Sequence, residues 1–418
     1  MKNQTDILII GGGAIGICCA HYLTRSGRRA TLVEKGDIGC GASLGNAGLV
    51  IPGLSIPLAA PGVITKGLKW MLDPESPFYI KPRLEPNFLK WLWKFSRHCT
   101  ADHLRRAVPI IRDLQLASMD LFKELATIDK IDLGLRQRGI VDAYRNRQAF
   151  EKGMPTASLL RQFGLENRVL DTDEINDLFP AIRTNIVGGF FYAQDAHLVP
   201  ERFVRGLAGH AEQNGAVILT NTEVIGMKKS GRRITTVSTT RGDFTANEIV
   251  LAGGSWSPTI VRDLKLRLLI EPAKGYSISY KRPMNFPEIP LILVEAKVAL
   301  TPMDEVLRLA GTLELAGWDH SINLRRVQAI LKSIPLYLPD FDVHSLELIE
   351  IWRGMRPCTP DGLPYIGRPK DLDNLIVATG HAMKGISMAP ITGKLVAQLA
   401  AGERPEVNLS ALKIERFS

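Results

Sequence analysis

Apolar residues along the chain follow two periods, and these periods define the elements that we predict. A continuous apolar run over residues 7–10 is typical of a strand that is buried on both faces. Apolar residues at helical spacing follow, from Ile15 to Leu23, and Gly27 suits the end of that helix. Residues 30–33 predict a second strand. The chain therefore opens as strand, turn, helix and strand.

The same periods predict the remaining elements. Helices are expected over residues 107–129, 154–178, 200–214 and 389–399. Strands are expected over residues 139–144, 188–192, 216–219, 234–238, 243–246, 248–255, 267–280, 298–302, 308–315 and 375–378.

Glycines at G-x-G-x-x-G spacing join the first strand to the first helix. Gly11 permits a tight turn, Gly13 lets backbone N–H groups approach a pyrophosphate, and Gly16 allows the helix to pack closely on the strand. Glu34 ends the second strand, where a carboxylate binds both ribose hydroxyls and disfavours a 2′-phosphate. A structural turn is the alternative, but all these features occur in register and predict a dinucleotide-binding unit. Ala14, Ile15 and Lys35 are further candidate cofactor contacts.

Length and composition indicate a globular protein with room for two domains. The chain has 418 residues, of which 45% are hydrophobic and 23% charged. Its net charge of +9 is spread along the chain without a basic block, so we expect no nucleic-acid partner. The five cysteines form no C-x-x-C pair, so neither a metal site nor a disulfide framework is expected.

The sequence also bears on location. No run of 18 or more apolar residues occurs, which argues against a transmembrane helix. The first strand begins within a few residues of the N-terminus, which leaves no room for a signal peptide. We therefore expect a cytoplasmic protein.

A glycine-dense segment follows Glu34, over residues 35–53. It cannot form a regular helix, and it is long for a plain surface loop, so we expect it to run beside a ligand and offer backbone N–H groups to it.

Within this segment the motif G-A-S-x-x-N-A-G, together with the opening unit, resembles the D-amino-acid oxidase superfamily of FAD enzymes, and most of all the bacterial D-amino acid dehydrogenases. The resemblance implies FAD rather than NAD. It also implies a two-domain α/β fold, with a Rossmann-like FAD domain and an α+β substrate domain built on an antiparallel sheet. The cofactor contacts that it implies in this loop are Gly41, Ala42, Ser43, Asn46, Ala47, Gly48 and Leu49.

A second motif, W-R-G-M-R-P-C-T-P-D-G-L-P-Y-I-G, begins at Trp352 and is more specific. Arg356 corresponds to the arginine that binds the substrate carboxylate in the related oxidases. A planar guanidinium suits this role because it gives a carboxylate two parallel charge-assisted hydrogen bonds. The alternative is a structural arginine paired to Glu350 or Asp361. Arg353 lies three residues earlier and does not match the motif position.

Two further side chains are candidates for the active site. Tyr276 lies in P-A-K-G-Y-S, which resembles a family motif, and implies a phenolic hydrogen bond to the substrate carboxylate; sheet packing is an equal alternative. His197 either faces the active site or is an ordinary loop histidine.

The resemblance also implies later segments that return to the cofactor. Their candidate contacts are Val224, Gly253, Gly254, Trp256, Gly380, His381, Lys384, Gly385 and Ile386. Related glycine oxidases carry a second arginine where this chain has Met383, so a second carboxylate anchor is not expected there. No cysteine lies in the last segment, and FAD is expected to be non-covalent.

The implied domains are discontinuous. Residues 1–55, 195–266 and 346–418 are expected to form the FAD domain, and residues 56–194 and 267–345 the substrate domain. The implied reaction is oxidation of a D-amino acid, D-proline or hydroxy-D-proline, with electrons passed to a quinone or another acceptor. The alternatives are a glycine or sarcosine oxidase that uses oxygen, and a flavin-binding subunit without amine chemistry.

Aromatic and basic residues interleave before residue 105. Phe88, Trp91, Trp93 and Phe95 alternate with Lys90, Lys94 and Arg97, as at a peripheral contact with the inner membrane. The alternative is a core helix whose buried face includes Leu89 and Trp93.

Overall fold

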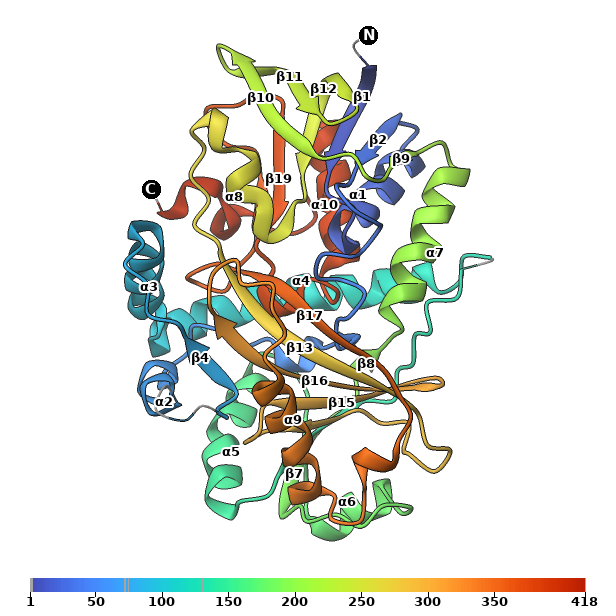
Figure 1. Cartoon of the computed structure of the whole chain (residues 1–418), viewed down its shortest axis with the longest axis vertical. Helices are drawn as coiled ribbons and strands as arrows, with labels where there is room; N and C mark the ends of the chain where they lie inside the picture. Colours follow the sequence, from blue (N-terminus) through green and yellow to red (C-terminus); the bar gives the residue numbers. More distant parts are fainter. Residues whose placement is uncertain (1–2, 71–72, 74, 130, 418) are drawn as a thin grey trace.

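The computed structural model of the chain describes residues 3–70, 73, 75–129 and 131–417. Two large sheets organise the molecule, one in the upper half and one in the lower half of Figure 1. The first sheet has the order β10-β11-β12-β1-β2-β9, with β19 beside β12 and β18 beside β19. Its strands are β1 (Asn3–Ile10), β2 (Ala30–Val33), β9 (Val217–Leu219), β10 (Val224–Ser230), β11 (Arg233–Thr239), β12 (Gly242–Leu251), β18 (Tyr365–Gly367) and β19 (Leu375–Thr379).

The centre of the first sheet is parallel and buried on both faces. Ile9 of β1 lies opposite Leu32 of β2 on one side and Val250 of β12 on the other. Helices α1 (Ala14–Arg25), α7 (Pro200–Gln213) and α10 (Ala389–Ala401) pack on one face. Residues of β10 to β12 and the C-terminal segment cover the other face. The chain therefore builds a three-layer Rossmann-like unit from distant segments, as predicted.

The second sheet is mostly antiparallel. Its order is β17-β13-β16-β15-β14-β5-β7-β6, with β4 beside β16. Helix α9 (Leu324–Tyr337) packs on the face that carries Tyr276 and Ile278. The strands are β4 (Phe78–Ile80), β5 (Ile140–Tyr144), β6 (Arg168–Leu170), β7 (Gly188–Tyr192), β13 (Glu271–Lys281), β14 (Leu291–Leu293), β15 (Val298–Met303), β16 (Val306–Leu315) and β17 (Leu348–Cys358).

The two halves are joined more closely than the predicted boundaries imply. The segment from residue 346 was expected in the FAD domain, but its first strand, β17, pairs with β13 in the second sheet. Helix α4 (Ala101–Leu125), expected in the substrate domain, crosses between the sheets and packs against α1 and α10 of the first one (Figure 1).

Two predicted elements differ in detail. The helix expected over 154–178 is divided into α5 (Arg147–Gln162), β6 and α6 (Thr172–Leu178), because Gly164 at φ +75° turns the chain. The strands expected over 243–246 and 248–255 form one strand, β12. The short elements α2 (Val63–Trp70), α8 (Ser257–Ile260), β3 (Leu49–Val50) and β8 (Ala196–His197) complete the fold.

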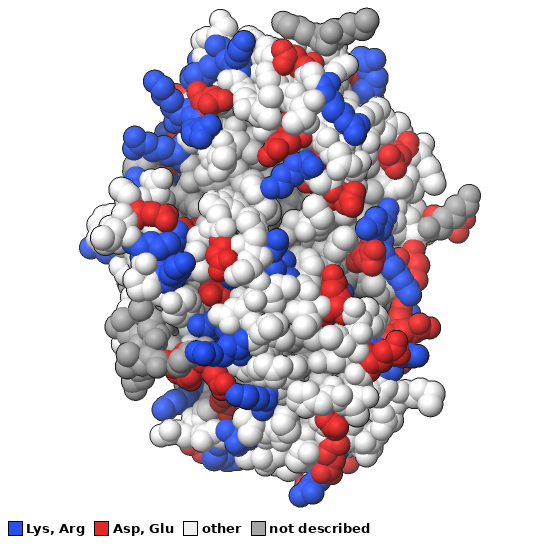
Figure 2. Space-filling model, viewed as in Figure 1, with Lys and Arg blue, Asp and Glu red and all other residues white. Residues whose placement is uncertain are grey.

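Helix α3 (Pro86–His98) buries a different face from the one named in the core-helix reading. Phe88, Trp91 and Phe95 are buried, whereas Leu89 and Trp93 are exposed. None of the helices in the described part of the chain is long and apolar enough to cross a membrane. On the face shown in Figure 2, basic and acidic side chains are intermingled rather than separated.

Candidate active site

A large cavity lies between the two sheets, at the carboxyl ends of the parallel strands. Its empty volume is about 1460 Å³, part of which is open to solvent. One side is formed by the carboxyl ends of strands β1, β2, β12 and β19. The other side is formed by Met355, Arg356 and Pro357 of β17. Open α/β sheets bind ligands in this position. Strands β2 and β12 lie on opposite sides of β1, so the chain connections diverge there and leave a crevice at the strand ends.

The glycine turn shapes one end of the cavity. Gly11 has φ +110°, and a Cβ atom there would lie 2.6 Å from the carbonyl oxygen of Ala252. A Cβ atom on Gly16 would lie 1.8 Å from the Gly11 oxygen, which confirms that the helix packs directly on the turn. The N-terminus of α1 consequently faces the cavity without a bulky side chain in front of it. The backbone N–H of Ala14 donates to Ser43 Oγ at 3.0 Å, which ties the glycine-dense loop to the helix.

Glu34 lies at the end of β2 and lines the same end. Its carboxylate accepts hydrogen bonds from the backbone N–H groups of Gly12 at 2.7 Å and Gly36 at 3.0 Å. Val224, at the start of β10, lines the cavity beside it. These contacts hold the carboxylate of Glu34 at the cavity wall.

The other end of the cavity is formed by the last cofactor segment and β17. Gly380, His381, Gly385 and Ile386 line it. His381 Nε2 lies 2.9 Å from Thr392 Oγ1, and burial lowers the pKa of His381 to about 3. The histidine is therefore neutral at physiological pH, and its ring is held by the start of α10.

Arg356 reaches this end of the cavity from β17. Its Nη1 donates to the carbonyl oxygen of Thr312 at 2.8 Å, and burial lowers its pKa from the usual arginine value. The acids of the alternative reading are not its partners: Asp361 is paired with Arg416, at 2.7 Å, and no ion pair joins Arg356 to Glu350 among the described residues. The guanidinium is thus held through one nitrogen, while a carboxylate partner is absent from the described residues around it.

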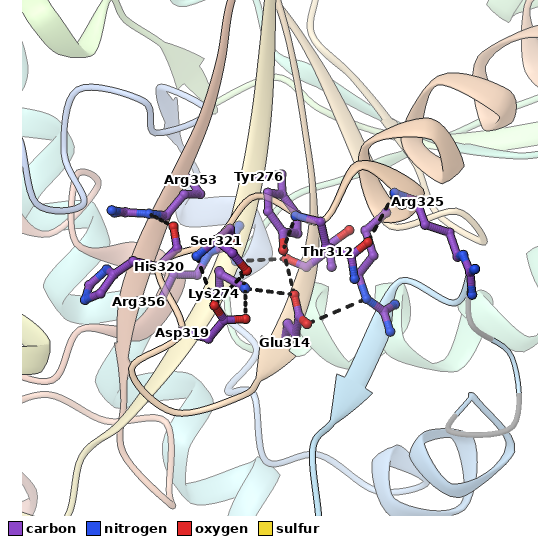
Figure 3. Close-up of polar contacts among 12 residues, drawn as sticks. Lys274, Tyr276, Thr312, Glu314, Asp319, His320, Ser321, Arg325, Arg353 and Arg356 are labelled. Carbon is purple, nitrogen blue, oxygen red and sulfur yellow. Dashed lines mark hydrogen bonds and ion pairs between the residues drawn. The ribbon is translucent and has the colours of Figure 1, made fainter.

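Thr312 holds Arg356 from an uncommon backbone conformation. Its φ of +65° is rare for a β-branched residue, and it lies where the pairing of β13 and β16 shifts register. The bulge turns the Thr312 carbonyl toward Arg356. Arg353, by contrast, donates from Nε to the carbonyl oxygen of His320 at 3.0 Å and is absent from the cavity wall (Figure 3).

Tyr276 lies on the opposite face of β13 from the cavity. Arg356 pairs with Ala273, three residues before Tyr276, so the two side chains point to opposite faces of the sheet. The Tyr276 hydroxyl donates to Glu314 at 2.7 Å and accepts from the backbone N–H of Asn323 at 3.3 Å (Figure 3). The predicted hydrogen bond from this tyrosine to a carboxylate at Arg356 does not fit that arrangement.

Most of the predicted cofactor contacts lie together on the cavity wall. They are Gly11, Gly13, Ala14, Ile15, Glu34, Lys35, Gly41, Ala42, Ser43, Asn46, Val224, Gly253, Gly254, Trp256, Gly380, His381, Gly385 and Ile386.

Six predicted site residues are absent from the wall. Gly16 and Tyr276 have the positions described above. Gly48 accepts a backbone hydrogen bond from Leu198, and Leu49 pairs with His197 in the small β3–β8 sheet, so Ala47, Gly48 and Leu49 pass beside the cavity. Lys384 is buried and donates to the carbonyl oxygen of Ile56 at 3.0 Å; burial lowers its pKa to about 8.

His197 is also absent from the wall. It is buried in β8, and burial lowers its pKa to about 4. The structure therefore favours a structural role over an active-site role for this histidine.

The sequence reasoning missed several wall residues. Some are ordinary apolar or small residues, and they could have been identified from their position at the carboxyl ends of parallel strands. Others lie in loops without a motif. The missed residues are Ile10, Val33, Thr222, Glu223, Ile225, Ala252, Ser255, Thr259, Ile260, Arg262, Asp263, Met355, Pro357, Ala378, Thr379 and Ala382.

One hydrogen bond fixes the two sides of the cavity to each other. Ser255 Oγ, in the turn after β12, donates to the carbonyl oxygen of Met355 in β17 at 2.9 Å. The strand that carries Arg356 is therefore attached to the turn that follows β12 in the first sheet.

The cavity fits FAD. Its wall includes Glu34 and Val224 as well as Arg356 and Ile386, and at Gly254 a Cβ atom would meet no protein atom within 4 Å, which leaves room for a cofactor. The N-terminus of α1 faces the cavity, and a helix N-terminus stabilises a pyrophosphate. The fold and the cavity together define a two-domain flavoprotein.

Comparison with known proteins identifies the family. A family model described as FAD dependent oxidoreductase matches residues 6–399, and the chain belongs to this family. It is similar to the D-amino acid dehydrogenase of Vibrio atlanticus, with 31% identity over 99% of this chain and 100% of that protein. It is also similar to the D-amino acid dehydrogenase of Bradyrhizobium diazoefficiens, with 33% identity over 99% of each chain.

Solved structures support the same fold. Glycine oxidase from Geobacillus kaustophilus has a TM-score of 0.80 at 23% identity, with 99% of each chain covered. L-proline dehydrogenase from P. horikoshii has a TM-score of 0.76 at 19% identity, with 100% of this chain and 98% of that chain covered. The protein is an FAD-dependent oxidoreductase, and the FAD predicted from the sequence is confirmed as its cofactor.

Proposed function

We propose that the protein oxidises a D-amino acid, or a cyclic D-amino acid such as D-proline or hydroxy-D-proline. The observation that carries the proposal is Arg356, a guanidinium at the cavity wall whose hydrogen bond is to a backbone carbonyl. Full-length relatives named D-amino acid dehydrogenase support the substrate class.

Arg356 binds the substrate carboxylate and orients the rest of the molecule. Two charge-assisted hydrogen bonds fix the carboxylate, so that the Cα–H points at the cofactor. FAD, when bound, would supply the hydride acceptor, its N5 atom. The lone pair of the neutral amine forms the C=N bond as the hydride leaves, and the imino acid hydrolyses in water to a keto acid and ammonia, or, from a proline, to the ring-opened amino keto acid.

We assign no side-chain base to the reaction. His381, which lines the cavity, is neutral but is held against Thr392. Orientation by Arg356 and the electronics of the cofactor are sufficient for the proposed chemistry.

The remaining wall residues hold FAD without a covalent bond. Glu34 binds the ribose, the N-terminus of α1 binds the pyrophosphate, and backbone groups at Val224 hold the adenine. No cysteine is among the wall residues that the structure describes. Release of the flavin into the supernatant on acid precipitation is the expected result.

Anaerobic bleaching of the bound flavin tests the function. A panel of D-amino acids, D-proline and hydroxy-D-proline is added to the oxidised holoenzyme, with the L-enantiomers and glycine as matched controls. We expect loss of the flavin absorbance with a D-substrate. A flavin that stays oxidised with the whole panel contradicts the proposal and favours a flavin-binding subunit without amine chemistry.

The proposed electron acceptor is a quinone or another acceptor that is not oxygen. The names of the relatives support a dehydrogenase, while the glycine oxidase fold supports the oxygen-using alternative. Hydrogen peroxide formed in air at the rate of substrate oxidation would favour the oxidase. Turnover that requires an added quinone or dye supports the dehydrogenase.

We further propose a peripheral contact with the cytoplasmic face of the inner membrane through α3. Leu84, Leu89 and Trp93 are exposed, and Lys90, Lys94 and Arg97 lie beside them. Exposed apolar side chains flanked by cations suit an anionic lipid surface.

Co-sedimentation with anionic vesicles at low salt tests the membrane contact. Replacing Leu89 and Trp93 by serine is expected to abolish binding, while serine at the exposed helical positions Leu324 and Leu336 of α9 is the matched control. Wild-type protein that stays in the supernatant contradicts the contact.

A further inference from the structure

A loop of the second sheet lies against the cofactor cavity at a pair of tryptophans. Residues 316–323 connect β16 to α9 and carry Trp318. The Trp318 ring lies 5.2 Å, centroid to centroid, from that of Trp256, which lines the cavity. Trp318 remains 43% exposed, so one aromatic group lines the cavity and the next opens to solvent.

Basic residues lie near this pair. Lys35 Nζ lies 4.0 Å from the centroid of the Trp256 ring. The His320 ring lies 6.1 Å from Trp318, and Arg353 binds the His320 carbonyl oxygen (Figure 3). Burial, and then the nearby Arg353 and Lys35, lower the pKa of His320.

The loop is anchored from within the sheet. Lys274 is fully buried, and its Nζ donates to Asp319 Oδ2 at 2.7 Å and to the Ser321 carbonyl oxygen at 3.1 Å. The hydrogen bond from Lys274 holds the pKa of Asp319 well below its usual range. The negative charge of Asp319 is thus paired with the positive charge of Lys274, and these contacts fix the loop that carries Trp318 (Figure 3).

We propose that Trp318, with Trp256 behind it, binds the ring of the quinone that reoxidises the reduced enzyme. The inference rests on the proposed function, and it assigns a place to the acceptor. A quinone ring is flat and poor in electrons, so it stacks on an electron-rich indole. Its carbonyl oxygens accept hydrogen bonds, and the negative charge that develops on them is stabilised by Lys35 and Arg353.

The step balances as a two-electron transfer. Two electrons and two protons pass to the quinone, whose two carbonyl oxygens become hydroxyls, and the cofactor returns to its oxidised form. Trp256 lines the same cavity as Arg356 but comes from the turn after β12, so the proposed acceptor site and the amino acid site are formed by different segments.

Stopped-flow reoxidation tests the proposal. The holoenzyme is first reduced with dithionite, so the result does not depend on the amino acid substrate, and is then mixed with a soluble short-chain quinone. Trp318→Ala is expected to lower the second-order rate by roughly tenfold or more, whereas Trp318→Phe, which keeps an aromatic ring, loses roughly threefold or less. Leu324→Ala, at another exposed apolar residue close in the chain, is the matched control and keeps the wild-type rate.

A second measurement reads binding rather than activity. Wild-type holoenzyme is irradiated with an azidoquinone and digested, and the labelled peptide is identified by mass spectrometry. Label on residues 316–323 or on Trp256 that excess quinone removes supports the proposal. Label elsewhere, or equal reoxidation rates for wild type and Trp318→Ala, overturns it. Failure of the proposed function has a separate signature, since then no D-amino acid bleaches the flavin, whatever the quinone does.

Discussion

The Nη1 atom of Arg356 lies 1.8 Å from the point where a Cβ atom of Gly275 would stand. The guanidinium therefore crosses the strand β13 over a residue that has no side chain. Any other residue at position 275 would occupy the same space as the guanidinium, so the glycine in P-A-K-G-Y sets the position of the arginine.

Gly275→Ala is expected to displace the guanidinium without removing it. A displacement of about 1 Å of a positioning group costs roughly 100-fold in rate, so kcat/KM for the D-amino acid should fall by that order. The flavin content and visible spectrum should be unchanged. Gly209→Ala, at a helical glycine with open space around it, is the control and retains activity. Wild-type kinetics for Gly275→Ala would contradict the placement of Arg356.

Arg356→Ala should lower kcat/KM by an amount equivalent to about 3 to 5 kcal/mol of transition-state stabilisation, because the substrate carboxylate loses its charged partner. Arg356→Lys should recover part of the loss, since an ammonium keeps the charge but lacks the planar fork. The measurement is the rate of anaerobic flavin reduction. Arg353→Ala is the matched control, because that side chain binds the His320 carbonyl. A loss below about 1 kcal/mol for Arg356→Ala would show that this arginine does not bind the substrate.

Gly16→Ala should yield protein with little or no bound flavin. The new methyl group would meet the Gly11 carbonyl oxygen and push α1 away from the turn that faces the cavity. The ratio of absorbance at the flavin band to that at 280 nm, with circular dichroism as a check of folding, measures the effect. A yellow variant with the wild-type ratio would contradict this account of the turn.

Asp142 should make the protein less stable as the pH rises. Burial raises the pKa of this carboxyl group to about 7. The folded state therefore keeps the proton above the unfolded pKa, and stability falls between roughly pH 4 and pH 7 as the unfolded chain ionises. Asp142→Asn should raise the free energy of unfolding at pH 8 by up to about 4 kcal/mol, and by much less at pH 4.

Urea denaturation at the two pH values measures this difference. Asp120→Asn, at a side chain that is 80% exposed, is the control and should change stability little at either pH. A gain for Asp142→Asn that is the same at pH 4 and pH 8 would assign the effect to packing instead of ionisation.

The sequence predicted those parts of the site whose chemistry is local. Gly11, Gly13 and Glu34 belong to one strand–helix–strand unit, so their spacing alone places them at the adjacent carboxyl ends of β1 and β2. Arg356 was identified from the motif that begins at Trp352, which spans the end of one strand and the turn that follows it.

Tyr276 shows why other parts could not be predicted. A motif gives its place in β13, but the face that it occupies relative to Arg356 depends on the register between two strands that are about eighty residues apart. The bulge at Thr312 and the pairing of Trp318 with Trp256 have the same origin. They arise from tertiary contacts between segments with no shared period or motif.

The hydrogen bond between Ser255 and Met355 has a consequence for how new substrate preferences arise in such a scaffold. It attaches the strand that carries Arg356 to the turn after β12, beside the cofactor cavity. The distance between the guanidinium and the reacting carbon is therefore fixed by the scaffold. Changes in substrate side-chain preference are therefore best sought in residues outside β17, and a designer who wishes to redirect the enzyme should leave this strand unchanged.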